Sequence, residues 1–127
     1  MRAILSRGRE ASLSERVEQA ISRGDSVSAL SLVTSAAADS INRFRSPEAD
    51  INTLGYRLMV SNRAAALAVF RLNTKAFPQS PNTWDSYGES LLVDGQRDAG
   101  IAAYRKALQL SPGLPSATQA LQRLGSK

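Results

Sequence analysis

Residues 47–112 read PEADINTLGYRLMVSNRAAALAVFRLNTKAFPQSPNTWDSYGESLLVDGQRDAGIAAYRKALQLSP, and this stretch contains one pattern twice. The recurring residues are Leu54, Gly55, Leu58, Ala66, Phe70 and Pro78 in the first copy, and Tyr87, Gly88, Leu91, Gly100, Tyr104 and Pro112 in the second. The first three pairs share one offset along the chain, and the last three share an offset that is longer by a single position. The difference therefore falls in the turn between the two helices of a copy. A repeat period of about 34 residues predicts a stack of similar helical units.

Working outward, proline, glycine and capping residues divide the chain from residue 12 onward into seven predicted helices. Ser12 and Glu15 form a capping box, and Ser-Pro pairs at 46–47 and 80–81 mark two later helix starts. The breaks between helices fall at Gly24, after Ile41, at Ser61-Asn62, at Pro78, at Asp94-Gly95 and at Pro112, and the last helix ends at Gly125. No segment alternates with period two for long enough to be a strand. We therefore expect an all-α fold, a right-handed stack of antiparallel helical hairpins with about seven helices.

Small residues at fixed positions predict how the paired helices pack. A residue without a large side chain lets two helices of one unit approach closely. The residues expected to allow this approach are Gly55 and Gly88 on the first helices and Ala66 and Gly100 on the second helices. Phe70 and Tyr104 are expected to fill the space between one unit and the next.

The two copies resemble the tetratricopeptide repeat (TPR) family, whose signature places an aromatic residue, Leu-Gly and Tyr on the first helix, then Ala, an aromatic residue and a terminal Pro on the second. The matching residues are Trp84, Tyr87, Gly88, Leu91, Gly100, Tyr104, Ala107 and Pro112 in one copy, and Ile51, Leu54, Gly55, Leu58, Ala66, Phe70 and Pro78 in the other. The earlier copy departs from the later one at Ile51, Leu54 and Asn73.

The resemblance extends to the domain organisation. Residues 12–45 are either a degenerate repeat or a capping hairpin, because Leu13, Val17, Ala20, Gly24, Ala29 and Val33 fill the same positions in the same order, with Ile41 in place of the turn proline. Residues 46–79 and 80–113 are the two repeats, and 114–125 resembles the helix that covers the exposed end of such arrays. We thus predict a basic segment over 1–11 and one helical domain over 12–127.

Residues 48–112 are also similar to the repeat tail at the C-terminus of some bacterial β-lactamase-related serine hydrolases and esterases. The residues that carry this similarity are Glu48, Asn52, Gly55, Tyr56, Ala66, Phe70, Asn73, Phe77, Pro78, Ser80, Asn82, Trp84, Asp85, Ser86, Gly88 and Glu89. In those enzymes the tail is an accessory region, and neither Ser-x-x-Lys nor Gly-x-Ser-x-Gly occurs in this chain. The resemblance therefore implies a stand-alone or excised accessory domain and not a hydrolase.

The composition argues against an enzyme. The chain has no cysteine and no histidine, so thiolate nucleophiles, imidazole bases and the commonest metal ligands are missing. Asp85 and Glu89 lie one helical turn apart, but no third acid converges with them, so a polar groove wall is favoured over an acid–base or metal pair. We expect no catalytic residue, no cofactor, no metal and no small-molecule substrate.

The formal net charge of +5 raises the hypothesis of nucleic-acid binding. However, the sixteen basic residues are scattered from Arg2 to Lys127 without a run of three, whereas tracking of a phosphate backbone calls for a basic stripe. A weak nucleic-acid or acidic-polymer binder is kept only as a second alternative.

Two observations bear on the location of the chain. Its uncharged stretches are far shorter than the about 20 apolar residues of a membrane span, so no membrane association is expected. Residues 1–7 contain arginines but no hydrophobic segment, so they do not form a secretory signal. A cytoplasmic location is the default expectation, and a periplasmic or secreted one is expected if the chain is an excised domain.

The TPR resemblance also implies a binding site, because the first helix of each pair lines the concave face on which extended peptides bind. The implied partner-binding groove contains Asn52, Tyr56, Met59, Asn82, Asp85, Glu89 and Leu92, joined by Glu18 and Ile21 from the N-terminal pair. The asparagines would bond a peptide backbone, the large side chains would supply apolar pockets, and the two acids would favour a basic or amine-bearing partner. The alternative is that these residues are solvated surface or pack on the N-terminal helices.

The leading hypothesis is a non-catalytic protein–protein interaction module that binds a peptide or partner protein on the concave face of a TPR stack. The first alternative is an accessory structural or oligomerisation domain of a bacterial serine hydrolase. A stack of three units or fewer is marginal, so self-association that covers its ends is a further expectation.

Overall fold

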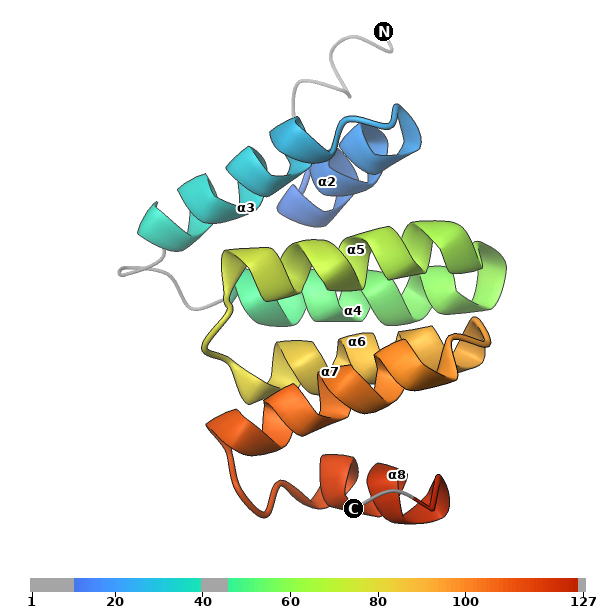
Figure 1. Ribbon diagram of the computed structural model, residues 1–127. Coiled ribbons are helices and arrows are strands. Elements are labelled where there is room, and N and C mark those ends of the chain that lie inside the picture. The colour runs from blue at the N-terminus through green and yellow to red at the C-terminus, as the bar shows by residue number, and fades with distance from the viewer. Residues whose placement is uncertain (1–10, 40–45, 126–127) are drawn as a thin grey trace, which may run out of the picture.

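The computed structural model describes residues 11–39 and 46–125, and this part of the chain consists of seven α-helices without a strand (Figure 1). The helices are α2 (Leu13–Ser22), α3 (Ser26–Asp39), α4 (Pro47–Ser61), α5 (Arg63–Ala76), α6 (Pro81–Val93), α7 (Arg97–Leu110) and α8 (Pro115–Arg123). The all-α prediction is confirmed. The predicted end of the second helix at Ile41 and residues 1–10 of the predicted basic segment over 1–11 lie outside the described residues.

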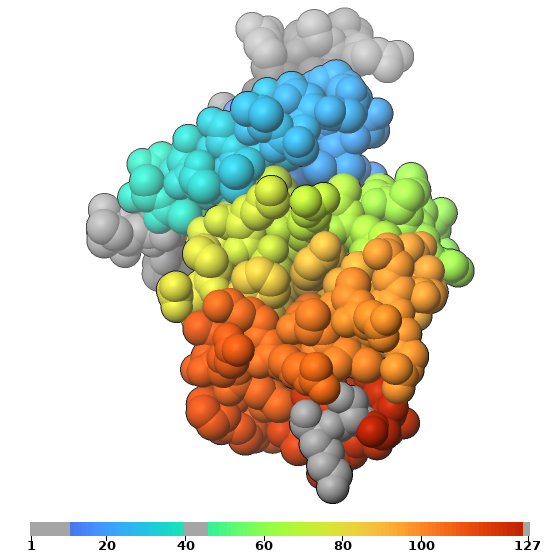
Figure 2. All heavy atoms as spheres, in the orientation of Figure 1, coloured from blue at the N-terminus to red at the C-terminus, as the bar shows by residue number. Residues whose placement is uncertain are grey.

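The helices form three hairpins that stack in chain order. Helix α2 pairs with α3, α4 with α5 and α6 with α7, and α8 packs on α7 at the C-terminal end (Figure 1). The hairpins join through contacts of α5 with α3 and with α6. In the space-filling view the described helices form one continuous stack (Figure 2). The first helices α2, α4 and α6 thus belong to one layer and the second helices α3, α5 and α7 to the other.

Capping residues explain where several helices begin. Ser12 Oγ accepts from the Glu15 amide at 3.1 Å and Glu15 Oε1 accepts from the Ser12 amide at 2.8 Å, which is the predicted capping box. Ser46 and Asn62 cap α4 and α5 in the same manner, by accepting from the amides three positions on. Ser80-Pro81 begins α6 as predicted, but Ser80 makes no side-chain cap on this helix, because its hydroxyl donates to a carboxylate oxygen of Glu48 in α4.

The turns of the first and third hairpins have the same backbone geometry. Gly24 and Gly95 both have positive φ, at +75° and +84°, which glycine adopts without a Cβ clash. The matching hydrogen bonds are Gly24 N to Ile21 O (2.9 Å) and Asp25 N to Ala20 O (2.9 Å), against Gly95 N to Leu92 O (3.0 Å) and Gln96 N to Leu91 O (2.9 Å). A single offset along the chain, the one from Gly24 to Gly95, relates every member of the first set to its counterpart in the second. This equivalence supports the reading of 12–45 as a degenerate repeat, which stays a prediction.

In the second and third hairpins, a glycine lets the two helices of the hairpin approach closely. A Cβ atom on Gly55 would lie 2.6 Å from ring carbons of Phe70, and one on Gly88 would lie 3.1 Å from the Tyr104 ring and 3.2 Å from the carbonyl oxygen of Gly100. The expected role of these glycines is confirmed. The expectation for Phe70 and Tyr104 needs correction, because each ring packs against the glycine of its own hairpin and not only between units.

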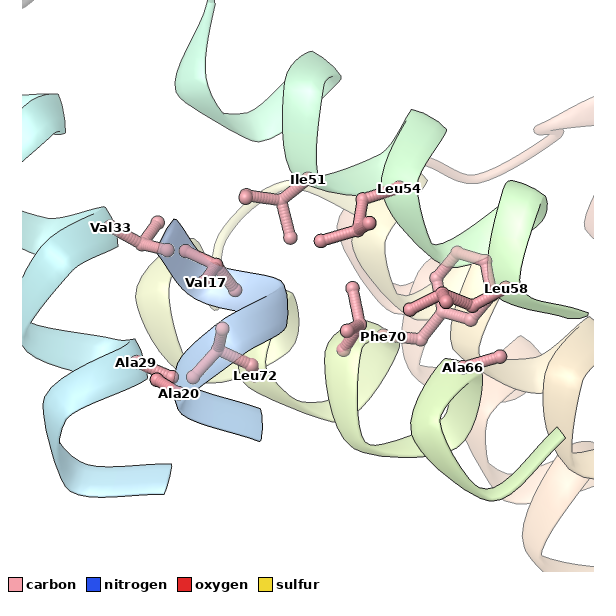
Figure 3. Close-up of a cluster of buried hydrophobic side chains, with 11 residues drawn as sticks. Val17, Ala20, Ala29, Val33, Ile51, Leu54, Leu58, Ala66, Phe70 and Leu72 are labelled. Carbon is pink, nitrogen blue, oxygen red and sulfur yellow. The ribbon is translucent and has the colours of Figure 1, made fainter. Parts of the chain in front are cut away.

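The apolar core consists of two clusters. The larger one draws side chains from α2, α3, α4 and α5, and Figure 3 shows these side chains meeting between the helices. Its largest members, Ile51, Leu54 and Phe70, are at most 1% exposed, and full burial of such a side chain contributes about 1.5–3 kcal/mol. The smaller cluster lies between α7 and α8 around Tyr104 and Leu121, with Trp84 and Leu92 packed against it. The two clusters leave the outer sides of both helix layers in contact with solvent.

Candidate partner-binding face

The residues predicted for the groove occupy equivalent positions on successive first helices. The offset from Gly55 to Gly88 relates α4 to α6, and the offset from Gly24 to Gly95 relates α2 to α6. Three rows result: Glu18, Tyr56 and Glu89; Ser14, Asn52 and Asp85; and Ile21, Met59 and Leu92. We call the surface formed by these rows, together with Asn82, the first-helix face.

Tyr56 lies at the centre of the first row and connects α4 to α6. Its Oη donates to Glu89 Oε1 at 2.7 Å and lies 3.2 Å from Ser86 Oγ. A phenol has a single donor hydrogen, so the Ser86 hydroxyl is the donor in the second contact. The half-buried ring packs edge-on against Phe70, with centroids 5.0 Å apart and an interplanar angle of 73°. The aromatic core contact therefore fixes the position of the hydroxyl that holds Glu89.

Burial keeps the Tyr56 phenol neutral. Desolvation is the main cause that raises the pKa of Tyr56 well above its ordinary value of 10.0. The Ser86 hydroxyl lowers this pKa, whereas the hydrogen bond to Glu89 raises it because a phenolate would lose its donor to the carboxylate. Tyr56 thus acts as a hydrogen-bond donor and not as an acid at neutral pH.

An ion pair continues the first row to the N-terminal hairpin. Arg57 Nη2 lies 3.2 Å from Glu18 Oε1, and both side chains are well exposed to solvent. An exposed pair of this kind contributes at most about 1 kcal/mol. Its consequence is positional: Glu18 and Arg57 meet beside Tyr56, so charged groups continue along the face from α2 to α6.

Asp85 is the most unusual group on this face. One carboxylate oxygen, Oδ2, accepts from Ser116 Oγ in α8 at 2.8 Å, and the other, Oδ1, is buried without a hydrogen-bond partner in the described structure. Burial is the main cause that raises the pKa of Asp85, the neighbouring Glu89 carboxylate raises it further, and the Ser116 bond lowers it. Helix α8 therefore reaches the first-helix face, and it meets a carboxylate whose charge is poorly compensated.

The apolar row is less open than the sequence suggests. Met59 and Ile21 are half-buried and pack on the larger core cluster, and Leu92 packs on the smaller one. Leu92 also reaches across to α7, where its Cδ2 would lie 2.8 Å from a Cβ on Gly100. These side chains seal the base of the face and offer only part of their surface to a ligand.

The two asparagines remain available to a ligand. Asn82 is exposed and Asn52 is half-buried, and within residues 11–39 and 46–125 neither side chain makes a hydrogen bond. Trp84, by contrast, is used internally: its Nε1 donates to the Pro78 carbonyl at 2.9 Å, and Lys106 Nζ lies 5.9 Å from the centroid of its ring.

The structure adds three residues that the sequence reasoning did not assign to the groove, Ser86, Arg57 and Ser116. Ser86 and Arg57 flank the first row, and Ser116 comes from the last helix. The repeat offset is the signal for the first row, since it places Tyr56 and Glu89 in the same position on neighbouring helices. No sequence signal points to Ser116, because its contact depends on how α8 turns back onto α6.

The described residues also bear on metal sites, membrane spans and cavities. In the part of the chain that the structure describes, no three Cys, His, Asp or Glu side chains are grouped to hold a metal ion. Among the described helices, none is both long and apolar enough to span a membrane. A cavity of about 890 Å³ lies between α2, α3 and the start of α4, and its lining includes none of the seven predicted groove residues.

Comparison with known proteins adds no assignment: no family model and no curated protein matches the chain.

Proposed function

We propose that this chain is a non-catalytic TPR-type interaction module whose first-helix face binds a cationic segment of a partner polypeptide. The support is the repeated hairpin with its small residues at the helix contacts, and the three rows that recur on α2, α4 and α6. Such a face presents equivalent side chains at regular intervals along the stack, which suits an extended peptide with its own regular side-chain spacing.

The Asp85 carboxylate is the observation that carries the proposal for a cationic partner. A buried carboxylate oxygen without a hydrogen bond destabilises the fold, and the nearby Glu89 adds like-charge repulsion. A lysine or arginine side chain placed against Glu89 offsets this repulsion. The partner thereby gains binding free energy from charges that the isolated chain leaves uncompensated.

Tyr56 prepares Glu89 for this role. Its hydroxyl holds Oε1, so the carboxylate is oriented before a ligand arrives and its remaining acceptor positions face solvent. Preorganisation reduces the conformational entropy lost on binding. Asn52 precedes Tyr56 on α4 and Asn82 precedes Glu89 on α6, and their amide groups supply donors and acceptors for a peptide backbone.

Titration with an array of extended peptides tests this function. The array contains Lys or Arg at varied positions, with matched peptides in which Gln replaces each basic residue. We expect wild type to bind a subset of the basic peptides, and Glu89→Gln to weaken that binding by about tenfold. Asp98→Asn, which removes an exposed carboxylate from α7, is the control and should bind as wild type does. If Glu89→Gln binds the same peptides as strongly as wild type, the proposed face is wrong.

The charge of Asp85 supplies a second test. Because its pKa is raised on folding, the ionised form is disfavoured in the folded state, and this cost is present at neutral pH and disappears as the pH falls through the folded pKa. Asp85→Asn keeps an acceptor for Ser116 and removes the charge, so it should raise the melting temperature at pH 7 while weakening the binding of basic peptides. In wild type, a bound peptide should lower the Asp85 pKa, measured from its side-chain carboxyl carbon by NMR. An unchanged pKa in the complex would place the cation elsewhere.

A further inference from the structure

The charges of the described helices divide between the two layers of the stack. The first helices α2, α4 and α6 contain six acidic and two basic residues, a net charge of −4, and the second helices α3, α5 and α7 contain six basic and two acidic residues, a net charge of +4. The acids are Glu15, Glu18, Glu48, Asp50, Asp85 and Glu89, and the basic residues of the second helices are Arg63, Arg71, Lys75, Arg97, Arg105 and Lys106. The two layers of helices thus have opposite net charges.

The basic layer is organised by the same repeat as the acidic one. Arg71 on α5 and Arg105 on α7 are related by the offset that takes Phe70 to Tyr104, and both arginines are exposed. Lys75 follows Arg71 by one helical turn and is exposed as well, and α5 contains no acidic residue. We call the outer surface of α5 and α7 around Arg71, Lys75 and Arg105 the second-helix face. Helices α5 and α7 lie in front of α4 and α6 in Figure 1, so the same orientation in Figure 2 presents this face.

Two cations of the second-helix face are poorly compensated within the chain. Arg71 and Lys75 make no ion pair among the described residues, whereas Arg97 at the edge donates to the Leu124 carbonyl and Lys106 lies over a tryptophan ring. The outward positions between the charges are alanines, Ala64 and Ala68 on α5 and Ala102 on α7. Because these alanine side chains are short, they do not cover the charged groups of Arg71 and Lys75.

We propose that the second-helix face of one molecule docks against the first-helix face of a second copy of this chain. Charge complementarity selects this occupant, because the surface that matches the second-helix face is present on every other copy. The interface joins two different faces, so it is heterologous. A pair of molecules therefore keeps one free face at each end, and further copies can add in a row. This inference does not depend on the proposed partner peptide, but a cationic peptide on the first-helix face would compete with the second copy.

Sedimentation equilibrium of the purified chain tests the proposal. At about 50 mM salt we expect a mean mass that rises with protein concentration, and at about 500 mM salt we expect monomer, because screening shortens the range of the attraction. Arg71→Glu with Arg105→Glu should weaken self-association by at least about tenfold. Arg16→Glu with Arg23→Glu, which changes the net charge equally but lies outside the second-helix face, should leave self-association in place.

A mixing experiment separates docking from loss of folding. The variant Glu18→Lys with Glu89→Lys replaces both acids of the first row by lysine. By itself, this variant should stay monomeric. Mixed with the Arg71→Glu, Arg105→Glu variant, it should form a complex, because each supplies a face that complements one on the other. Restored association supports the proposal. A mixture that stays monomeric, or wild type that is monomeric at low salt up to about millimolar concentration, overturns it. Retention of a monomeric wild type on heparin through Arg71 and Arg105 also overturns it and assigns the basic face to a polyanion.

Discussion

The second and third hairpins bring their two helices together through different contacts. In α4–α5 the ring of Phe70 lies directly on Gly55, and the facing residue is Ala66. In α6–α7 both helices have a glycine, and a Cβ on Gly88 or on Gly100 would lie 3.2 Å from the carbonyl oxygen of the other. Both hairpins therefore pack an aromatic ring on a glycine, and the α6–α7 hairpin adds a close contact of backbone against backbone. The comparison shows that equivalent positions of the repeat can be packed by different atoms.

The largest expected effect follows from Gly55→Ala. The added methyl group would lie 2.6 Å from ring carbons of Phe70, which is fully buried and packed against Tyr56, so the ring has no free space to move into. Overpacking costs about 1–3 kcal/mol, and alanine regains about 1 kcal/mol of helix propensity. Because a contact of 2.6 Å falls at the severe end of that range, we expect a net loss of up to about 2 kcal/mol in urea unfolding. Phe70→Leu should reduce the penalty of the added methyl in a double-mutant cycle, and a Gly55→Ala protein as stable as wild type would contradict ring-on-glycine packing.

Gly88→Ala should have a smaller effect. Its methyl group would lie 3.1 Å from the Tyr104 ring and 3.2 Å from the Gly100 oxygen, so these neighbours need to shift by only a few tenths of an ångström. The gain in helix propensity offsets part of that cost, and we expect a net loss of about 1 kcal/mol in the same assay. A loss equal to or larger than that of Gly55→Ala would show that the backbone contact in α6–α7 is the less adaptable of the two.

The smallest effect concerns Tyr104, which occupies the position of Phe70 in the other hairpin. Burial, followed by the carboxylates of Asp85 and Glu89, raises the pKa of Tyr104 to about 12 from an ordinary value of 10.0, against a lowering by Arg123. The folded state thus favours the neutral phenol, so its contribution to stability is complete below pH 10 and is lost as the pH rises toward 12.

Tyr104→Phe makes the two positions alike and should remove this part of the alkaline loss of stability. The experiment belongs in a Tyr56→Phe background, because the Tyr56 pKa is raised as well. At pH 7 we expect a change within about 1 kcal/mol, since the ring and its packing remain. Equal loss of stability between pH 10 and 12 with and without the Tyr104 hydroxyl would assign the alkaline transition to other groups.

Much of the fold was predictable because its signals are local. Capping at Ser12 and Ser46 and the breaks at Gly24 and Gly95 depend on residues a few positions apart, so the pattern of side chains is sufficient to locate them. The close approach at the glycines was predictable for a second reason, which is that a repeated residue type at a repeated position points to a shared contact. The helix start at Ser80-Pro81 was predicted correctly, but the acceptor of the Ser80 hydroxyl was not, because the Glu48 carboxylate is distant in sequence.

The candidate face was predictable only in part. The exposed side of α6 contains Asn82 and Glu89 as expected, because helical period alone separates the outward residues from the buried ones. The half-buried state of Leu92 and Met59 was not predictable, since it depends on how far a neighbouring helix extends over them. The Asp85–Ser116 contact could not be predicted from the sequence for the same reason.

The sequence by itself determined the seven helices, their hairpin pairing and the division of charge between first and second helices, because these follow from residue spacing along single helices. Tertiary structure alone decided which equivalent residues touch: Tyr56 with Glu89, Glu18 with Arg57, and Asp85 with Ser116. Such contacts depend on the rotation and shift of each helix against the next. The rotation and shift of each helix depend on the packing of both core clusters together, so no single stretch of sequence specifies them.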